Sequence, residues 1–194
     1  MHFLQNIRFA LLFLPVLLSG CVIVENLKLM ADGYDEYNSS ASVSVYRMNN
    51  TPYYNGKSNY LIIADKSGKY IRYLVDIGSM RVGFPTVYMD DYSAVVKKLT
   101  MFIEWADKPY EERNSTLLKV QGALPQNNQK AAKGITDFYL FMNPDVNNNT
   151  PYLAYNRSDG GFGTVRYLMS KQDAEIIIRE LAIWKSNSEL KNKK

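Results

Sequence analysis

Apolar and polar residues alternate over several short stretches in the first half of the chain. Ser42-Val43-Ser44-Val45 alternates in the manner of a strand with one buried face. Residues 60–64 form a compact apolar run, and residues 69–77 alternate again, with every second side chain apolar. The segment between them, Asp65-Lys66-Ser67-Gly68, has turn chemistry, so the two stretches predict a β-hairpin. A further short strand is expected over residues 84–89.

Two longer stretches instead repeat their apolar residues every three or four positions. The first follows Asp90-Asp91, whose carboxylates can accept hydrogen bonds from first-turn N–H groups, and it ends before Pro109. The second follows Ser170, which has Asp173 three residues on, in the shape of a capping box. The two apolar stripes are Tyr92, Val95, Val96, Leu99, Phe102 and Ala106, then Ala174, Ile177, Ile178, Leu181 and Trp184. Both stretches predict amphipathic helices.

The second half of the chain again places strands before a helix. Strands are predicted over residues 135–142, 152–155 and 164–169. The joining segment is uneven, with a strand expected at Thr116–Val120 and an exposed loop at Gln126–Lys133. Because runs of strands precede each helix, the pattern predicts an α+β fold with a largely antiparallel sheet and two amphipathic helices.

The two halves match in sequence at an offset of 79 residues. Tyr60-Leu61 recurs as Tyr139-Leu140, and Trp105 recurs as Trp184. This predicts an internal duplication of a strands-then-helix unit, over about 41–108 and 114–188. If the two units were related by a pseudo-twofold axis and shared one sheet, both helices would cover the same face of that sheet. The other face would be open to solvent or to a partner. A pentapeptide also matches at a conflicting offset of 99, which shared Asn-Pro turn chemistry explains without ancestry.

The N-terminal residues have a different character. Residues 1–20 contain one basic residue, Arg8, then an apolar run that is too short for the ~20 residues of a transmembrane helix. Leu18-Ser19-Gly20-Cys21 follows, and this motif resembles the lipobox of bacterial lipoprotein precursors. The resemblance implies that residues 1–20 are a signal peptide, that Cys21 is lipidated, and that the mature chain begins there.

The residue after the cysteine influences whether a bacterial lipoprotein stays in the inner membrane or is sorted to the outer membrane. In the lipoproteins that this leader resembles, aspartate at that position commonly retains the protein in the inner membrane, and here it is Val22. The resemblance therefore implies an outer-membrane lipoprotein in a Gram-negative source. The alternative is an ordinary secretory signal with a chance cysteine. Cys21 is the only cysteine in the chain, whereas secreted proteins normally use cysteines in pairs.

The length and charge of the mature chain limit the number of domains and the kinds of partner that it can have. From Cys21 it runs 174 residues with a formal charge of +3, which suits one domain with a real core. Residues 21–40 are expected to be a polar tether, with a short strand near Glu25–Met30 as an alternative for part of it. The domain is then expected over 41–188 and a basic, solvated tail over 189–194. The basic residues are scattered and the tail cluster is short, so they do not by themselves indicate binding to anionic lipid or nucleic acid.

Little catalytic chemistry is available. The only histidine, His2, lies in the leader, so the mature chain has no Ser-His-Asp or Cys-His arrangement and no zinc site built on such ligands. Asp90-Asp91 is read as a helix cap rather than a metal pair, and Asp145–Asn149 as a hairpin loop rather than a calcium site. Gly160–Gly163 precedes a strand, so it is read as a bend rather than a phosphate loop. No cofactor is expected.

Tyrosine is the one surplus, with 15 in the chain. Tyr53 and Tyr54 stand next to Asn55-Gly56 in an expected loop, where exposed rings suit contacts with a protein or a glycan. The alternative is the ordinary strand preference of tyrosine. The sequence favours a non-enzymatic envelope lipoprotein that binds another envelope protein or a glycan. A small-ligand-binding domain and a hydrolase using carboxylates or a Ser/Lys pair are the alternatives, and the oligomeric state is left open.

Overall fold

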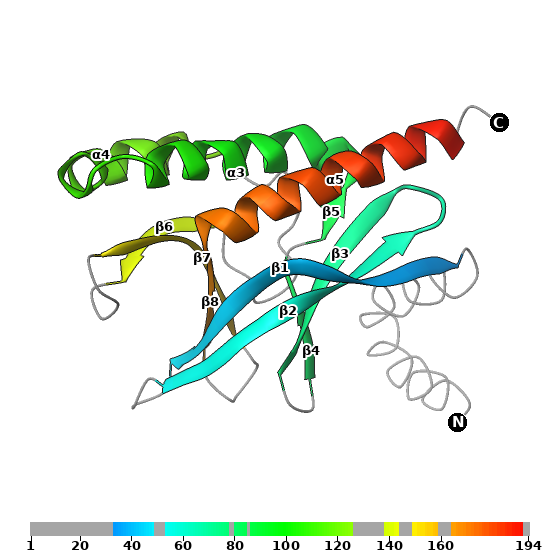
Figure 1. Cartoon of the computed structure of the whole chain (residues 1–194), viewed down its shortest axis with the longest axis horizontal. Coiled ribbons are helices and arrows are strands. Elements are labelled where there is room, and N and C mark those ends of the chain that lie inside the picture. Colours follow the sequence, from blue (N-terminus) through cyan, green and yellow to red (C-terminus); the bar gives the residue numbers. More distant parts are fainter. Residues whose placement is uncertain are drawn as a thin grey trace, which may run out of the picture.

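The computed structural model of the chain describes residues 33–48, 53–77, 80–84, 86–125, 138–143, 149–158 and 164–191. In this part of the chain one antiparallel sheet is covered on one face by helices α3 and α5 (Figure 1), which confirms the α+β fold. The leader, Cys21 and the Gly160–Gly163 bend lie outside the described residues. The elements are β1 (Tyr34–Met48), β2 (Tyr53–Asp65), β3 (Tyr70–Ile77), β4 (Met80–Gly83), β5 (Val87–Tyr88), the 3-10 helix η1 (Met89–Asp91), α3 (Tyr92–Ala106), α4 (Tyr110–Ala123), β6 (Tyr139–Asn143), β7 (Thr150–Ser158), β8 (Thr164–Met169) and α5 (Lys171–Lys191).

The strand order in the sheet is β4-β3-β2-β1-β8-β7-β6, and β5 also pairs with β3. The predicted β2–β3 hairpin forms, with Leu61 opposite Leu74 and Ala64 opposite Ile71. Its turn is held by the Asp65 carboxylate, which accepts hydrogen bonds from the Ser67 and Lys69 backbone N–H groups at 3.3 and 3.2 Å. Gly68 takes a φ of 76°, which favours glycine.

The core lies between the sheet and the two amphipathic helices. Every second residue of the β2–β3 hairpin is buried on the helix side, as the alternation predicts. Both predicted helical stripes face this layer, and Trp105 of α3 is buried there with its indole N–H donating to the Arg113 carbonyl at 3.1 Å. The two helices therefore bury their apolar stripes against one continuous sheet face.

Helix α4 corrects the expectation for the joining segment. Thr116–Val120 lies within this helix and not in a strand. None of its residues is fully buried, so it has no apolar stripe that could reveal it in the sequence. Leu117 and Val120 of α4 are partly buried against the core, and polar contacts add to this packing. Arg113 donates to the carbonyls of Ala106, Lys108 and Asn149 at 3.3, 2.9 and 3.3 Å, which ties α4 to the end of α3 and to the β6–β7 turn.

Helix α4 also covers the sheet edge at β6. The Gln121 side-chain oxygen accepts a hydrogen bond from the Leu140 N–H at 2.6 Å, and its NH2 group donates to the Phe138 carbonyl at 3.3 Å. The amide thus occupies the backbone groups that another strand would use. Such covering limits edge-to-edge association of sheets.

The N-terminal boundary of the sheet is earlier than expected. The predicted tether over residues 21–40 overlaps β1, which begins at Tyr34. Residues 34–38 are exposed and mostly polar, so no alternation marks them as a strand. They pair through the backbone with residues 61–65 of β2, and the register shifts between Asn38 and Ser42. Backbone pairing alone therefore extends the strand into the predicted tether.

The ends of the helices differ in part from expectation. Asp90 and Asp91 belong to η1. Asp91 occupies the N-cap position of α3, as expected, but its side chain makes no capping hydrogen bond. At α5 the cap is confirmed, because Ser170 Oγ accepts a hydrogen bond from the Asp173 N–H at 3.2 Å. α5 continues to Lys191, so the first residues of the expected basic tail are helical.

The order of the strands excludes the pseudo-twofold arrangement. With both helices on one face, a twofold axis would have to be normal to the sheet and would reverse the strand order of the second unit. Instead β4-β3-β2 is followed across the sheet by β8-β7-β6, in the same direction. Helices α3 and α5 begin at Tyr92 and Lys171, which keeps the offset of 79 residues. The duplication itself stays a prediction.

Candidate functional site

A row of large polar and aromatic side chains crosses four strands on the sheet face opposite the core. It consists of Tyr46 on β1, Arg166 on β8, Asn156 on β7, and Tyr139 and Phe141 on β6, and we call it the aromatic row. The register places Tyr46 opposite Arg166 and Arg166 opposite Asn156. All five side chains are partly exposed. Residues directly opposite each other in a sheet share a face, so the row is one continuous surface.

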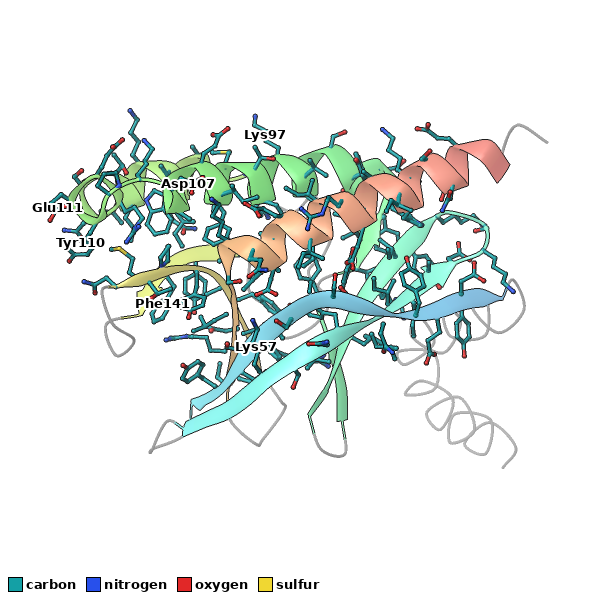
Figure 2. The ribbon with its side chains drawn as sticks, viewed as in Figure 1. Lys57, Lys97, Asp107, Tyr110, Glu111 and Phe141 are labelled. Carbon is teal, nitrogen blue, oxygen red and sulfur yellow. The ribbon has the colours of Figure 1, made fainter. Side chains whose placement is uncertain are left out.

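The alternation of each strand explains why the row lies outside the core. The neighbouring residues Val45, Tyr155 and Tyr167 are buried on the helix side, and the Tyr155 and Tyr167 rings stack with centroids 4.7 Å apart. Successive strand side chains point to opposite faces, so the residues next to these must face away from the helices. Figure 2 shows Phe141 on the side of β6 away from α4.

Direct contacts hold the row in one arrangement. The Tyr139 hydroxyl donates to Asn156 Oδ1 at 2.8 Å, and Arg166 Nε donates to the same oxygen at 3.4 Å. The Arg166 guanidinium lies over the Phe141 ring, with its carbon 4.9 Å from the ring centroid. Arginine over an aromatic ring is an attractive arrangement, worth about 0.5–1 kcal/mol at an exposed site. The row therefore offers a surface whose side chains are already ordered.

The structure corrects the expected place of Tyr53 and Tyr54. They do not lie in a loop but begin strand β2, where Tyr54 is opposite Tyr46 and Tyr53 is opposite Arg47. Asn55 is an extra residue at a register shift, and Gly56 has a φ of 107°. The Asn-Gly pair thus forms a bulge within the strand rather than a turn between strands. Tyr54 on β2 therefore lies directly opposite Tyr46, which is the last residue of the aromatic row on β1.

A buried carboxylate joins α5 to β1. Asp173 is only 4% exposed, and its Oδ1 accepts hydrogen bonds from the N–H and Oγ of Ser42 at 2.8 and 2.9 Å. Its other oxygen accepts from Ser170 Oγ, and Lys57 Nζ lies 3.8 Å away. These partners satisfy the carboxylate as a structural link between helix and sheet.

A second carboxylate, Glu180 of α5, sits half-buried over the β1 irregularity. Ser39 Oγ lies 2.7 and 2.9 Å from its two oxygens, so the hydroxyl donates to the carboxylate. Burial raises the pKa of Glu180, and the hydrogen bond from Ser39 opposes this in part. Ionising Glu180 therefore costs more in the folded protein than in the unfolded chain.

We expect Glu180→Gln to stabilise the protein near neutral pH and to have no effect in acid. A raised folded-state pKa means that the wild type is at its most stable below the unfolded pKa and loses stability as pH rises through the folded pKa. Glutamine keeps an acceptor for Ser39 and carries no charge. Because water screens a half-exposed group, the gain should stay below about 1 kcal/mol. Urea unfolding of both proteins from pH 4 to pH 8 measures it, and a wild type that gains relative stability with rising pH contradicts it.

A shallow cavity of about 390 Å³ lies where the end of α3 meets the starts of β7 and α5. It is lined by Ala106, Thr150, Pro151, Ser170, Lys171, Gln172 and Glu175. The hydrogen bond to Asp107 raises the pKa of Lys171, so this amine holds its proton and is a poor base. The cavity has no aromatic lining residue. The cavity therefore lacks the deprotonated lysine that a Ser/Lys hydrolase would need. It also lacks the aromatic lining expected of a small-ligand pocket.

The remaining candidates from the sequence are dispersed. Of the acidic residues near the α3–α4 corner, Asp107 pairs with Lys171 and Glu112 pairs with Lys108 at 2.6 Å, on the solvent-exposed surface. Within the described ranges, no group of three His, Cys, Asp or Glu residues is placed to hold a metal ion. No helix among these residues is both long and apolar enough to cross a membrane.

The sequence alone does not reveal the aromatic row, because its members come from four strands. The surplus of tyrosine is the available signal, and it indicates Tyr53 and Tyr54 on the neighbouring strand. Arg166 and Asn156 gave no signal, since only the register brings them next to Phe141 and Tyr139.

Comparisons with known proteins give little further guidance. No protein-family model and no curated protein matches the chain. Similar solved structures include ErpC from Borrelia burgdorferi, described as a member of the complement regulator acquiring family of surface proteins, at 10% identity. Another is described as the complement regulator acquiring outer surface protein BbCRASP-4 or ErpC, at 12% identity. Each alignment has a TM-score of 0.36 and covers 74% of this chain and 96% of the other. This TM-score is too low to show a shared fold, so function is inferred from the residues of this chain.

Proposed function

We propose that this chain is a non-enzymatic binding protein of the bacterial envelope, held to the outer membrane by lipid on Cys21. The lipobox-like Leu18-Ser19-Gly20-Cys21 supports the anchor, and Val22 supports the outer membrane as its destination. Two or three acyl chains give stable attachment where a single chain is marginal. Binding is favoured over catalysis because the mature chain has no histidine and the cavity at α5 contains a lysine that holds its proton.

The aromatic row is the observation that carries the binding role. Tyrosine and arginine are among the side chains that most often dominate the binding energy of protein interfaces, and phenylalanine is enriched at interface cores. Here they are ordered by contacts among themselves, so a partner would meet a surface that loses little side-chain entropy on binding. We therefore propose another envelope protein as the first class of partner.

A glycan is the second class. The Arg166 guanidinium lies over the Phe141 ring and donates a hydrogen bond to the Asn156 amide oxygen. An aromatic face flanked by hydrogen-bonding groups suits the apolar and hydroxylated sides of a sugar ring. The small-ligand and hydrolase readings have no comparable surface among the described residues.

The position of the row suits presentation to a partner. β1 has 15 residues, which at ~3.3 Å per residue makes it about 50 Å long. Its first residue, Tyr34, follows the segment that leads from Cys21, and Tyr46 is near its other end. Figure 1 shows the end of β1 and the start of β2 far from the start of β1. The row therefore lies well away from the point where the anchored segment joins the domain.

We expect the double variant Arg166→Ala/Phe141→Ala to lose its partner. Truncating two ordered interface side chains removes ~1–2 kcal/mol each, so recovery should fall at least about tenfold. The measurement is recovery of envelope proteins, and of insoluble cell-wall glycan, with the intact lipoprotein after affinity purification. Lys97→Ala/Tyr110→Ala, at exposed positions on α3 and α4, is the matched control and should recover the partner as the wild type does.

Two results would contradict the proposal. One is equal recovery by the row variant and the wild type, which would place the contact elsewhere. The other is that the wild type recovers neither protein nor glycan, which would favour the small-ligand-binding and hydrolase hypotheses. Circular dichroism of each variant separates loss of contact from loss of fold.

A further inference from the structure

Three separate segments meet at one end of the domain. They are the start of β1 (residues 33–37), the β2–β3 turn (residues 65–69) and the last residues of α5 (residues 188–191), and we call them the anchor-proximal end. The Lys66 N–H donates to the Gly33 carbonyl at 3.2 Å. A Cβ on Gly68 would lie 2.7 Å from the Ser188 Cβ, so turn and helix are in close contact. Figure 1 shows the start of β1, the β2–β3 turn and the end of α5 together at one end of the domain.

The anchor limits how far this end can be from the bilayer. Twelve peptide steps separate Cys21 from Gly33. At ~3.5 Å per step, this segment reaches at most about 40 Å, whatever its conformation. Gly33 directly precedes β1, so the anchor-proximal end is the part of the domain that lipidation of Cys21 would hold nearest the membrane.

Exposed tyrosines are found at this end. Tyr34 and Tyr37 are 43% and 42% exposed, which makes them two of the few large apolar-bodied side chains exposed in the described part of the chain. Both lie within four residues of the start of β1. A tyrosine ring with one apolar part and one hydroxyl suits the boundary between headgroups and acyl chains.

The charges at this end are mixed. The three segments contain three lysines (Lys66, Lys69 and Lys191) and four carboxylates, and Lys185, Lys193 and Lys194 flank the last segment in the sequence. Lys66 and Asp35 pair only loosely, at 3.9 Å with both side chains more than half exposed, and Glu189 pairs with Lys185 at 3.8 Å. Lys69 is exposed on the turn, and the sequence continues past α5 with Lys193 and Lys194. Lysines near an anionic bilayer each contribute about 1 kcal/mol of attraction.

We propose that the anchor-proximal end rests on the headgroup layer of the membrane that carries the protein. Tyr34 and Tyr37 then enter the interface, and the turn lysines Lys66 and Lys69 lie against lipid phosphates. This rests on the proposed lipidation of Cys21. The contact adds a second attachment to the acyl chains and fixes the orientation of β1, so that the aromatic row is directed away from the bilayer.

Single introduced cysteines can test the contact. In the lipidated protein the Cys21 sulfur carries the lipid, so Lys69→Cys or Glu111→Cys supplies the one reactive thiol. Lys69 is at the anchor-proximal end, and Figure 2 shows Glu111 at the other end of the molecule. Each variant carries a fluorescent dye and is reconstituted in vesicles of phosphatidylethanolamine and phosphatidylglycerol that contain a headgroup nitroxide. We expect the Lys69→Cys dye to lose most of its fluorescence and the Glu111→Cys dye to keep it.

Matched variants assign the contact to the proposed side chains. Tyr34→Ser/Tyr37→Ser in the Lys69→Cys protein should restore much of the fluorescence, whereas Tyr110→Ser, at an exposed tyrosine on α4, should restore none. Raised salt should restore part of it, because the lysine attraction is screened. Quenching that neither the tyrosine change nor salt reduces overturns the proposed chemistry.

The outcomes also separate this contact from the anchor. If the protein fails to float with the vesicles, lipidation at Cys21 and the proposed function fail together. If it floats and both dyes remain equally bright, the anchor stands and the domain is held away from the bilayer, which overturns this inference alone.

Discussion

Replacing Cys21 by serine should abolish fatty acid labelling of the protein and move it out of the outer-membrane fraction. A serine hydroxyl cannot form the thioether to diacylglycerol, and no apolar helix among the described residues can take over the attachment. The loss should be essentially complete, because each buried CH2 of an acyl chain contributes about 0.8 kcal/mol and two or three chains are removed at once. Metabolic labelling with an alkyne fatty acid and fractionation of the membranes measure both effects.

The acyl label is the decisive readout of this experiment. An uncut leader can hold a precursor at the inner membrane, so fractionation alone does not report on the lipid. Ser19→Ala keeps a small residue before Cys21 and should be labelled as the wild type is. A Cys21→Ser protein that still takes up the label, or remains in the outer membrane without it, shows that the attachment does not depend on this cysteine.

The sequence predicts those elements whose side chains alternate between core and solvent. The β2–β3 hairpin is an example, because its turn residues and its two alternating strands are contiguous. α3 and α5 are others, since each buries one stripe against the same sheet face. In these segments the local pattern is a direct consequence of burial on one side, so it can be read without knowing the neighbours.

Other elements depend on partners that the local sequence does not specify. The first residues of β1 are exposed and form a strand only because β2 pairs with their backbone. α4 has no buried residue and is fixed through Arg113 and Gln121, which contact segments distant in the sequence. Asn55-Gly56 has turn chemistry but forms a bulge, because the strand continues on both sides of it.

The candidate site belongs to this second group. The aromatic row needs β1, β8, β7 and β6 side by side and in one register, so no single stretch of sequence displays it. The leader is the opposite case. The motif that resembles a lipobox is contiguous, and the sequence therefore suggests a site of attachment more readily than a contact surface.

Replacing Asp173 by alanine should destabilise the domain by about 3 kcal/mol, the largest loss expected from a polar substitution in this fold. The change removes the carboxylate that accepts a hydrogen bond from the capping Ser170 hydroxyl, and it leaves the Ser42 N–H and hydroxyl without their acceptor in a buried position. A buried donor without a partner costs more than the hydrogen bond itself contributed. Because Ser42 is on β1 and Asp173 is on α5, the loss weakens the contact between helix and sheet.

Exposed and conservative variants give the controls for this prediction. Asp107→Ala removes an exposed carboxylate that also pairs with a lysine, and it should cost less than about 1 kcal/mol. Asp173→Asn keeps an acceptor for Ser42 and should fall between the two. Urea unfolding of the protein in detergent, followed by circular dichroism, ranks all three. If Asp173→Ala costs no more than Asp107→Ala, burial of this carboxylate does not hold α5 on the sheet, and the apolar stripe of α5 alone must do so.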